Sequence, residues 1–194
     1  MIQQLVRRLH ESSPGVLEHD GPEAAVLVAL TNSDDPQVVL TRRTMHLSSH
    51  GGEVAFPGGK KDCDDADLLT TALREAHEEV GLPPEQVEVL GALSQSMSKH
   101  GLRVTPYVGL IDPETDLTPN PAELDEIFTV PLRFFLEDKR HRTDAFKYRG
   151  KTHYVPAYEY QGNIIWGLTA CILVELLNIG LGADIPVRPR PEHQ

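Results

Sequence analysis

The pattern of apolar and polar positions along the chain predicts short strands alternating with two main helices. Apolar and β-branched runs bounded by turn-forming residues are typical of strands. The clearest strands are expected at 24–30, 38–41, 54–56, 87–93 and 105–111, and further ones at 127–130, 154–160 and 163–166. Apolar residues at helical spacing predict one helix that ends at Gly81 and a second over 168–179. Together these elements predict one α/β domain in which helices cover both faces of a mixed sheet.

The helix before Gly81 combines a predicted core stripe with crowded carboxylates. The stripe consists of Ala66, Leu69, Leu73, Ala76 and Val80. At about 100° per residue, Glu75 is expected almost opposite this stripe, with Glu78 and Glu79 flanking it. Like charges so close together disfavour an isolated helix, and a bound cation would remove that cost. Because carboxylate oxygens are hard ligands, the pattern predicts a site for Mg²⁺ or Mn²⁺.

A Pro-Gly-Gly segment upstream of this helix supports the same prediction. Val54, Ala55 and Phe56 are followed by Pro57-Gly58-Gly59, which the sequence predicts as a turn. A glycine backbone without side chains can approach a metal ion or a phosphate closely. A glycine turn ahead of an acidic helix is therefore more informative than the acidic helix alone.

Composition limits the classes of partner. Of 194 residues, 40% are apolar and 24% are charged, as in soluble globular proteins. The net charge of -11 argues against general binding of nucleic acid or anionic membranes, but a local cation site could still hold a small anionic ligand. Cys63 and Cys171 lie far apart in sequence and suggest neither a disulfide framework nor a zinc site. This cysteine usage fits a reducing compartment, and we expect a cytoplasmic protein.

The two ends of the chain are expected to lie outside the main domain. Residues 1–22 form a predicted N-terminal extension, in which Ile2, Leu5, Val6 and Leu9 have the spacing of an amphipathic helix. The main domain is expected over 23–182, with a flexible tail at 183–194. No apolar run is long enough for a signal-peptide core or a membrane span. The helix over 168–179 is apolar nearly all round, which predicts burial or a place at a homodimer interface.

The segment 59–82 resembles the Nudix box, whose pattern is G-x5-E-x7-R-E-U-x-E-E-x-G-U with U aliphatic. Arg74 to Leu82 fits the second half of this pattern. The interval from Gly59 to Arg74 is one residue longer than in the pattern. The early acid of the box therefore falls on Asp65 when counted forward from Gly59, and on Ala66 when counted back from Arg74.

The residues upstream of the box resemble one branch of this superfamily, the coenzyme A diphosphatases. That branch tolerates the longer loop and has the signature LLTxRSxxLRxHxGxVxFPGG, to which residues 40–59 are similar. The matching positions include Thr41, Arg43, Leu47, His50, Gly52, Val54 and Phe56, whereas Thr44 and Ser48 replace a serine and an arginine. Further similarity at 104–106, 123–132 and 166–170 extends the resemblance over roughly residues 24 to 180.

The resemblance implies a Nudix-type α/β/α sandwich and a metal-dependent hydrolase. The implied reaction splits coenzyme A or acyl-coenzyme A into 3′,5′-ADP and a 4′-phosphopantetheine product. Another diphosphate substrate, such as ADP-ribose, a dinucleotide or a nucleoside triphosphate, is an alternative. A non-catalytic nucleotide-sensing module is a third possibility, although such modules usually lose metal-binding acids, and Glu75, Glu78 and Glu79 are all present.

The resemblance also implies roles for individual acidic residues. Glu75 and Glu79 are the expected main metal ligands, with Glu78 as a third and the Gly59 carbonyl as a backbone ligand. Arg74 is expected to hold a glutamate in place. The general base is either Glu78 or Glu123, because Nudix enzymes often recruit an acid from a later loop.

Basic residues near the box are candidates for substrate binding. Arg42, Arg43 and Lys60 could bind phosphates, because cations counter the charge of a diphosphate and arginine offers paired donors. His50 could contact the substrate or cap the turn at 51–52. Arg43 and Lys60 are the preferred candidates of this set.

Overall fold

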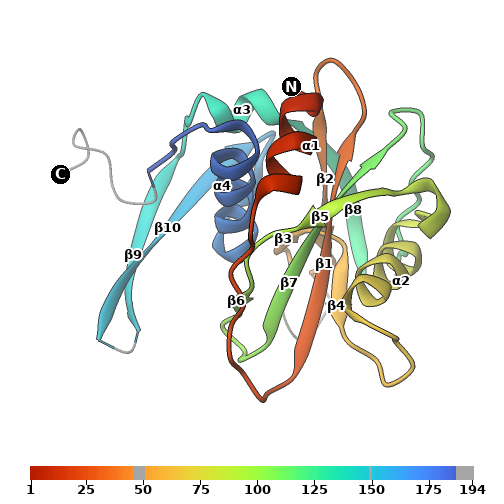
Figure 1. Cartoon of the computed structure of the whole chain (residues 1–194), viewed down its shortest axis with the longest axis horizontal. Helices are drawn as coiled ribbons and strands as arrows, with labels where there is room; N and C mark the ends of the chain where they lie inside the picture. The colour runs from red at the N-terminus through yellow and green to blue at the C-terminus, as the bar shows by residue number, and fades with distance from the viewer. Residues whose placement is uncertain (46–50, 149, 187–194) are drawn as a thin grey trace.

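The computed structural model of the protein describes residues 1–45, 51–148 and 150–186, and the side chain of Tyr148 is not included in that description. The described part of the main sheet contains eight strands (Figure 1). They are β1 (Glu23–Thr31), β2 (Gln37–Arg43), β3 (Val54–Ala55), β4 (Gly58–Lys60), β5 (Glu88–Ala92), β6 (Ser96–Met97), β7 (Arg103–Ile111) and β8 (Leu124–Pro131). All strands predicted up to residue 130 are present, and the predicted mixed sheet is confirmed.

Strand β1 organises the sheet because it pairs differently along its two edges. On one edge it runs parallel to β7 over its whole length. On the other edge its first residues pair with β4, and near its end Leu30 pairs with Val38 of β2. Strand β2 then turns away to pair with β8 and β3. The sheet therefore opens between β2 and β4, next to the Gly58–Gly59 segment.

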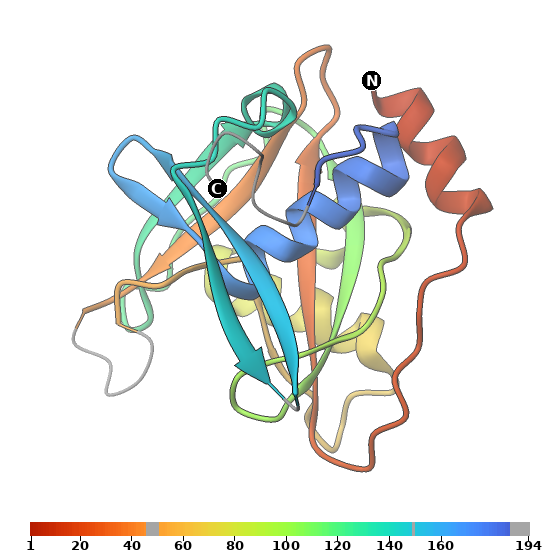
Figure 2. The same ribbon diagram turned by 90° about the vertical axis from the view of Figure 1, so that its left-hand side faces the viewer.

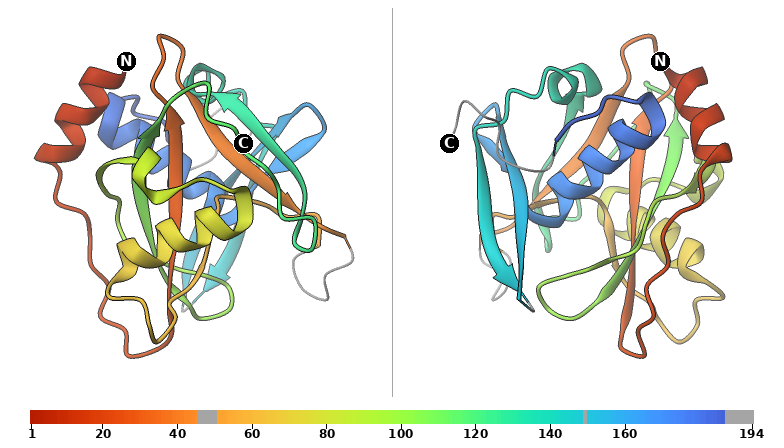
Figure 3. Two further views of the ribbon diagram at one scale, coloured as in Figure 1. Left: turned by 90° about the vertical axis from the view of Figure 1, so that its right-hand side faces the viewer. Right: turned by 60° about the vertical axis from the view of Figure 1, so that its left-hand side comes forward.

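Helices cover both faces of the sheet, as the sequence predicted. Helix α2 (Leu68–Val80) lies on one face, and α1 (Ile2–Glu11) and α4 (Gly167–Leu181) lie on the other, as the two views of Figure 3 show. Alternate residues of β1 point to opposite faces. Leu27 belongs to the core under α2, whereas Val28 belongs to the core under α4.

The apolar helix α4 is buried within the chain itself. Eight of its residues are buried, and α1 and β10 pack against it. Helix α1, confirmed as an amphipathic helix, inserts the fully buried Leu5 next to Gly180 of α4. A Cβ atom at Gly180 would lie 3.1 Å from Cγ of Leu5, so the glycine allows the two helices to approach closely. Burial therefore accounts for the apolar sequence of α4, and the homodimer stays a prediction.

A smaller three-stranded sheet follows the main sheet. It contains β9 (Arg142–Tyr148), β10 (Lys151–Tyr160) and β11 (Asn163–Ile165). The β9–β10 ribbon extends away from the main sheet in Figure 1 and lies in front of it in Figure 2. The sequence predicted β10 and β11 but not β9, whose polar residues give no apolar run, nor the short α3 (Leu132–Leu136) and the 3-10 turn η1 (Pro84–Gln86).

The start of the C-terminal tail, which the sequence predicted as flexible, is held against the domain. The Asn178 side chain exchanges two hydrogen bonds with the backbone of Ile185, at 3.0 and 2.7 Å. Arg140 donates to the Pro186 carbonyl at 2.7 Å. The predicted tail is thus fixed as far as Pro186, and residues 187–194 lie outside the described residues. None of the helices described here has both the length and the apolar character needed to cross a membrane.

Candidate active site

Both ends of α2 are fixed, which sets the direction of its acidic side chains. Asp67 caps the first turn and accepts a hydrogen bond from the Thr70 amide at 2.7 Å. At the other end Gly81 has φ 69°, a left-handed conformation that glycine adopts without strain. The helix begins at Leu68, so Ala66 lies before it and is exposed.

The buried face of α2 differs from the predicted stripe. The buried residues of the helix are Thr71, Ala72, Ala76, Glu79 and Val80, whereas Leu69 and Leu73 are only half-buried. Glu79 was expected beside the exposed acidic face, but its side chain is only 5% exposed. The cause is a partner on another element, because Oε2 of Glu79 accepts a hydrogen bond from the Gly58 amide at 3.1 Å.

The Gly58–Gly59 segment is a strand rather than the predicted turn. It pairs antiparallel with β1, with Gly59 opposite Ala25. A Cβ atom at Gly59 would lie 2.4 Å from the carboxyl carbon of Glu75. The missing side chain therefore leaves room for a carboxylate from α2 directly against the strand.

The backbone carbonyl that faces α2 belongs to Gly58 rather than to Gly59. Leu27 donates to the Pro57 carbonyl at 2.8 Å, and Lys61 donates to the Glu23 carbonyl at 3.0 Å. Successive residues of an antiparallel strand direct their amide and carbonyl groups to opposite sides. Gly59 therefore directs its carbonyl toward β1, while Gly58 faces Glu79. The predicted backbone metal ligand fits Gly58 better than Gly59.

Burial raises the pKa values of the two carboxylates that face this strand. The pKa of Glu79 rises to about 7, mainly through desolvation, and the Gly58 amide is the largest opposing influence. The pKa of Glu75 is also raised, again mainly by burial and against hydrogen bonding from Arg74. Two adjacent carboxylates that ionise with difficulty, beside a glycine strand, fit a divalent cation. Within the described residues, no three His, Cys, Asp or Glu side chains already converge as a complete ligand set.

Arg74 links the acidic residues of α2 to the loop before it. Its Nη1 atom donates to Glu75 at 3.0 Å and to Glu78 at 3.3 Å. Its Nε and Nη2 atoms form a paired interaction with the Asp65 carboxylate, each at 2.9 Å. This pairing holds the pKa of Asp65 well below its usual range. The predicted contact of Arg74 with a glutamate is present, and Asp65 rather than Ala66 occupies the place of the early acid.

Glu123 and Glu78 occupy different positions at this site. Glu123 lies just before β8, and its backbone carbonyl accepts a hydrogen bond from the Thr44 amide at 2.9 Å. Its negative charge raises the pKa values of both Glu75 and Glu79, so it contributes to the same electrostatic environment. Glu78 is 56% exposed, and its carboxylate contacts Arg74. Both remain candidates for the general base.

The two adjacent arginines of β2 have separate environments. Nη1 of Arg43 lies 3.6 Å from Oε1 of Glu79. The buried Nε atom of Arg43 has no hydrogen-bond partner among the described residues, and 29% of the side chain stays exposed beside Glu79. Arg42 instead forms an ion pair with Glu126 at 2.7 Å and donates to Asn163 at 2.9 Å. The register of β2 with β8 shifts between these two residues, and their side chains contact different elements, Arg42 those of β8 and β11 and Arg43 that of α2.

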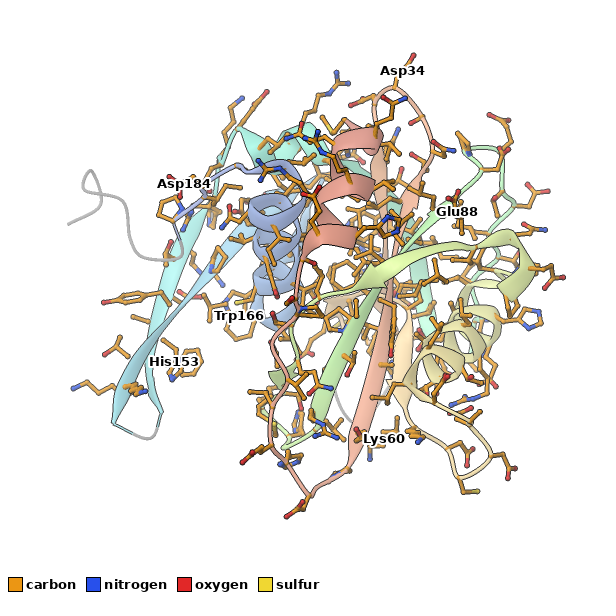
Figure 4. The ribbon with its side chains drawn as sticks, in the orientation of Figure 1. Asp34, Lys60, Glu88, His153, Trp166 and Asp184 are labelled. Carbon is orange, nitrogen blue, oxygen red and sulfur yellow. The ribbon has the colours of Figure 1, made fainter. Side chains whose placement is uncertain are left out.

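The remaining predicted substrate-binding residues are not brought to Glu79 by any described contact. Lys60 is exposed at the end of β4 (Figure 4), and its backbone carbonyl accepts a hydrogen bond from Arg74 at 3.2 Å. His50 lies outside the described residues. Among the three predicted substrate-binding residues that the structure describes, only Arg43 therefore contacts a carboxylate predicted to bind the metal.

The Gly59→Ala variant tests the close approach of Glu75 to β4. The added Cβ atom would overlap the Glu75 carboxyl group, so that carboxylate must move while the strand and Arg74 stay in place. We expect the concentration of Mg²⁺ that gives half-maximal activity to rise about tenfold or more. Gly15→Ala, at an exposed position where the added Cβ atom would make only ordinary contacts with Ser94 at 3.4 and 3.5 Å, is the control for adding a methyl group. Unchanged dependence on Mg²⁺ in Gly59→Ala would contradict the assignment of Glu75.

Comparison with known proteins places these features in a family. The model of the NUDIX domain matches residues 21–149. The chain is 46% identical over 164 residues to an uncharacterized Nudix hydrolase, NudL, of Photorhabdus laumondii, with 84% of this chain and 87% of that protein covered. It is 40% identical over 164 residues to Nudix hydrolase 15, mitochondrial, of Arabidopsis thaliana, with 80% of this chain and 58% of that longer protein covered.

Solved structures show the same fold at low sequence identity. A MutT/nudix family protein from Enterococcus faecalis has a TM-score of 0.53 and 16% identity, with 92% of this chain and 68% of that chain covered. A C. elegans Ap4A hydrolase has a TM-score of 0.50 and 19% identity, with 60% of this chain and 85% of that chain covered. Both agree with a mixed sheet between helices.

Proposed function

Because the chain belongs to the Nudix family of hydrolases, we propose that it cleaves the diphosphate of coenzyme A or acyl-coenzyme A to 3′,5′-ADP and a 4′-phosphopantetheine product. Family membership confirms the predicted enzyme class, a Nudix diphosphatase. The substrate is the proposal. It is supported by the signature at 40–59, whose Arg43 lies beside Glu79 of the box helix. This contact between the upstream signature and the box helix at Glu79 is the observation that most directly supports the proposal.

The residues at the site fit a bound divalent cation, Mg²⁺ or Mn²⁺. Glu75, Glu79 and the Gly58 carbonyl would hold it, and Glu78 would join them if it left Arg74. Such an ion supplies charge neutralisation and water activation in diphosphate hydrolysis. The ligand set is all oxygen, which suits these two ions rather than zinc.

The protein groups around the carboxylates have distinct chemical tasks. The Arg43 side chain, 29% exposed beside Glu79, can present its guanidinium donors to a phosphate oxygen. Arg74 orients Glu75 and is itself oriented by Asp65. Glu123 or Glu78 would accept a proton from the attacking water, a task that requires an ionised carboxylate. Glu123 acts electrostatically on both Glu75 and Glu79, whereas Glu78 is 56% exposed and therefore accessible to water.

A substrate panel tests the proposal directly. The protein is incubated with Mg²⁺, and separately with Mn²⁺, in the presence of coenzyme A, acetyl-coenzyme A, ADP-ribose, NADH or a nucleoside triphosphate, and the products are identified by mass. We expect 3′,5′-ADP from the coenzyme A compounds, with the highest kcat/KM of the panel. Preferred turnover of ADP-ribose, NADH or a triphosphate would replace coenzyme A by that substrate. Absence of turnover with either metal would instead favour a nucleotide-sensing module.

Location and assembly stay predictions. The cysteine usage suggests a reducing compartment, and we retain the cytoplasm as the proposed location. The Arabidopsis relatives carry names that place one in mitochondria and another in chloroplasts, which is a statement about those proteins. A homodimer can be tested by measuring the mass of the protein in solution.

A further inference from the structure

An exposed apolar face lies on β11 and at the start of α4. Ile164 is 39% exposed and Trp166 is 40% exposed, whereas Asn163 and Ile165, which alternate with them, are buried. This alternation places Ile164 and Trp166 on one face of the extended segment. Trp166 is the N-cap residue of α4, where a residue with a polar side chain would ordinarily be favoured. Neither burial nor helix capping therefore accounts for the indole at this position.

The segment that carries Trp166 is held at two points to the strands of the candidate active site. Upstream of the tryptophan, Asn163 accepts a hydrogen bond from Arg42 at 2.9 Å, and Arg42 is the residue next to Arg43 on β2. Downstream, the Thr169 hydroxyl donates to the Val54 carbonyl of β3 at 3.1 Å. Thr169 lies in the first turn of α4, three residues after Trp166.

The chain continues from this second anchor to the metal-binding strand. Val54 precedes Gly58 by four residues. Four residues span at most roughly 14 Å. Trp166 therefore occupies a fixed position beside the strand that leads to the Gly58 amide and Glu79. Figure 4 shows Trp166 beside the beginning of α4, between the β9–β10 ribbon and the main sheet.

We propose that the indole of Trp166 stacks on the nucleobase of the diphosphate substrate. The proposed substrate carries one planar aromatic group, adenine, and it is joined to the diphosphate through a single ribose. Stacking on an aromatic side chain contributes about 1–3 kcal/mol per base and needs only an accessible ring face. The inference rests on the proposed function for the nucleotide nature of the ligand. It adds the residue that recognises the base.

The fact that Trp166 is the only tryptophan of the chain provides a direct binding signal. We expect 3′,5′-ADP, added without metal, to quench the intrinsic fluorescence along a saturable curve. The matched probe 4′-phosphopantetheine has a phosphate but no base, and we expect no quenching from it. Quenching by 4′-phosphopantetheine alone would overturn the proposal and assign the indole to the other half of the substrate. A fluorescence change that depends on protein concentration without ligand would assign it to contact with a second copy.

Kinetics of two variants complete the test. We expect Trp166→Leu to raise KM for coenzyme A about tenfold with kcat within twofold of wild type, and Trp166→Phe to retain most of the affinity. Phe146→Leu makes the same replacement at another exposed aromatic residue, 49% exposed on β9, and should leave KM unchanged. Equal KM values for wild type and Trp166→Leu would refute base stacking.

The outcome for Trp166 can be separated from that for the proposed reaction. If the wild-type protein hydrolysed ADP-ribose instead of coenzyme A, the proposed substrate would be wrong, but quenching by ADP would still support stacking. If coenzyme A were hydrolysed and no adenine nucleotide quenched the fluorescence, the proposed reaction would be supported and the proposed role of Trp166 would be refuted.

Discussion

Replacement of Glu79 by glutamine is expected to lower kcat by about a thousandfold while the protein stays folded. Glu79 is the buried carboxylate that faces the Gly58 amide and Arg43, so it is the acid most enclosed by the candidate metal site. Loss of a charged metal ligand removes several kcal/mol of stabilisation from the reacting diphosphate, and about 4 kcal/mol corresponds to a factor of a thousand in rate. Glutamine keeps the shape and an oxygen acceptor for Gly58.

The same variant is expected to make the metal-free protein more stable at alkaline pH. The pKa of Glu79 is raised from an ordinary 4.5 to about 7 in the folded protein, chiefly by burial. A raised carboxyl pKa means that the folded state binds the proton more tightly than the unfolded state does. The resulting stability is fully present below pH 4.5 and is lost as the pH rises through about 7. Ionised Glu79 therefore costs the fold about 3 kcal/mol above pH 8.

Thermal unfolding and kinetics measured side by side check both effects. With metal removed by a chelator, Tm of Glu79→Gln should exceed that of wild type at pH 8.5 by several degrees, and the difference should shrink toward pH 5. Glu85→Gln, at an exposed position of η1, controls for the loss of one negative charge. Wild-type kcat in Glu79→Gln would remove this residue from the metal site. A Tm difference that did not vary with pH would contradict the raised pKa.

The elements that could be predicted from sequence are those whose apolar residues decide their structure. Strand β1 is buried on both faces and reads as a continuous apolar run, and β7 pairs with it along its whole length. Helix α4 is apolar all round for the same reason, since α1 and β10 cover it. In these cases local sequence and tertiary burial point to the same structure.

The elements that were missed depend on partners far away in sequence. Two glycines after a proline predict a turn, yet Gly58 and Gly59 form a strand because β1 offers them an antiparallel edge. The helical pattern predicts Glu79 near the exposed face, and its hydrogen bond from the Gly58 amide explains why it is buried instead. A carboxylate can be buried when it is hydrogen-bonded and near a positive group, and neither condition is visible in the helical pattern.

Sequence spacing located the candidate site more accurately than it assigned individual basic residues. Arg74 contacts Glu75 as predicted, and it also pairs with Asp65, the early acid obtained by counting forward from Gly59. For Arg42 and Arg43, extending the predicted strand by two residues would have placed them on opposite faces. No local sequence pattern predicts that Asn163 contacts Arg42, because the two residues lie 121 positions apart in the chain.

Replacement of Asp65 by asparagine is expected to destabilise the protein by about 3 kcal/mol and to lower kcat about tenfold or more. The Asp65 side chain is 4% exposed. Four donors point at its carboxylate: Nε and Nη2 of Arg74, the Asp62 amide and the Thr71 hydroxyl. Asparagine has the same shape but replaces one acceptor oxygen by a donor group, so its amide nitrogen must face a donor in either orientation.

The effect on activity is expected to pass through Arg74. This guanidinium contacts Asp65 on one side and Glu75 on the other, so loss of its paired interaction would allow Glu75, a predicted metal ligand, to change position. A merely structural role would lower Tm without changing the metal dependence. We therefore expect Asp65→Asn to raise the concentration of Mg²⁺ required for half-maximal activity. The fraction of folded protein is measured under the same conditions, so that unfolding is not mistaken for weaker metal binding.

The pH dependence of stability separates the charge of Asp65 from its shape. The pKa of Asp65 is held below its ordinary value of 3.8, chiefly by hydrogen bonding to Arg74. Its ionised form therefore stabilises the fold above pH 3.8, and that contribution is lost as the pH falls further. The difference in Tm between wild type and Asp65→Asn, roughly 10 °C at pH 7, should narrow below pH 4. Asp64→Ala, at the exposed neighbouring position, should behave like wild type, and an equal loss there would show that the loop rather than the Asp65–Arg74 pair is responsible.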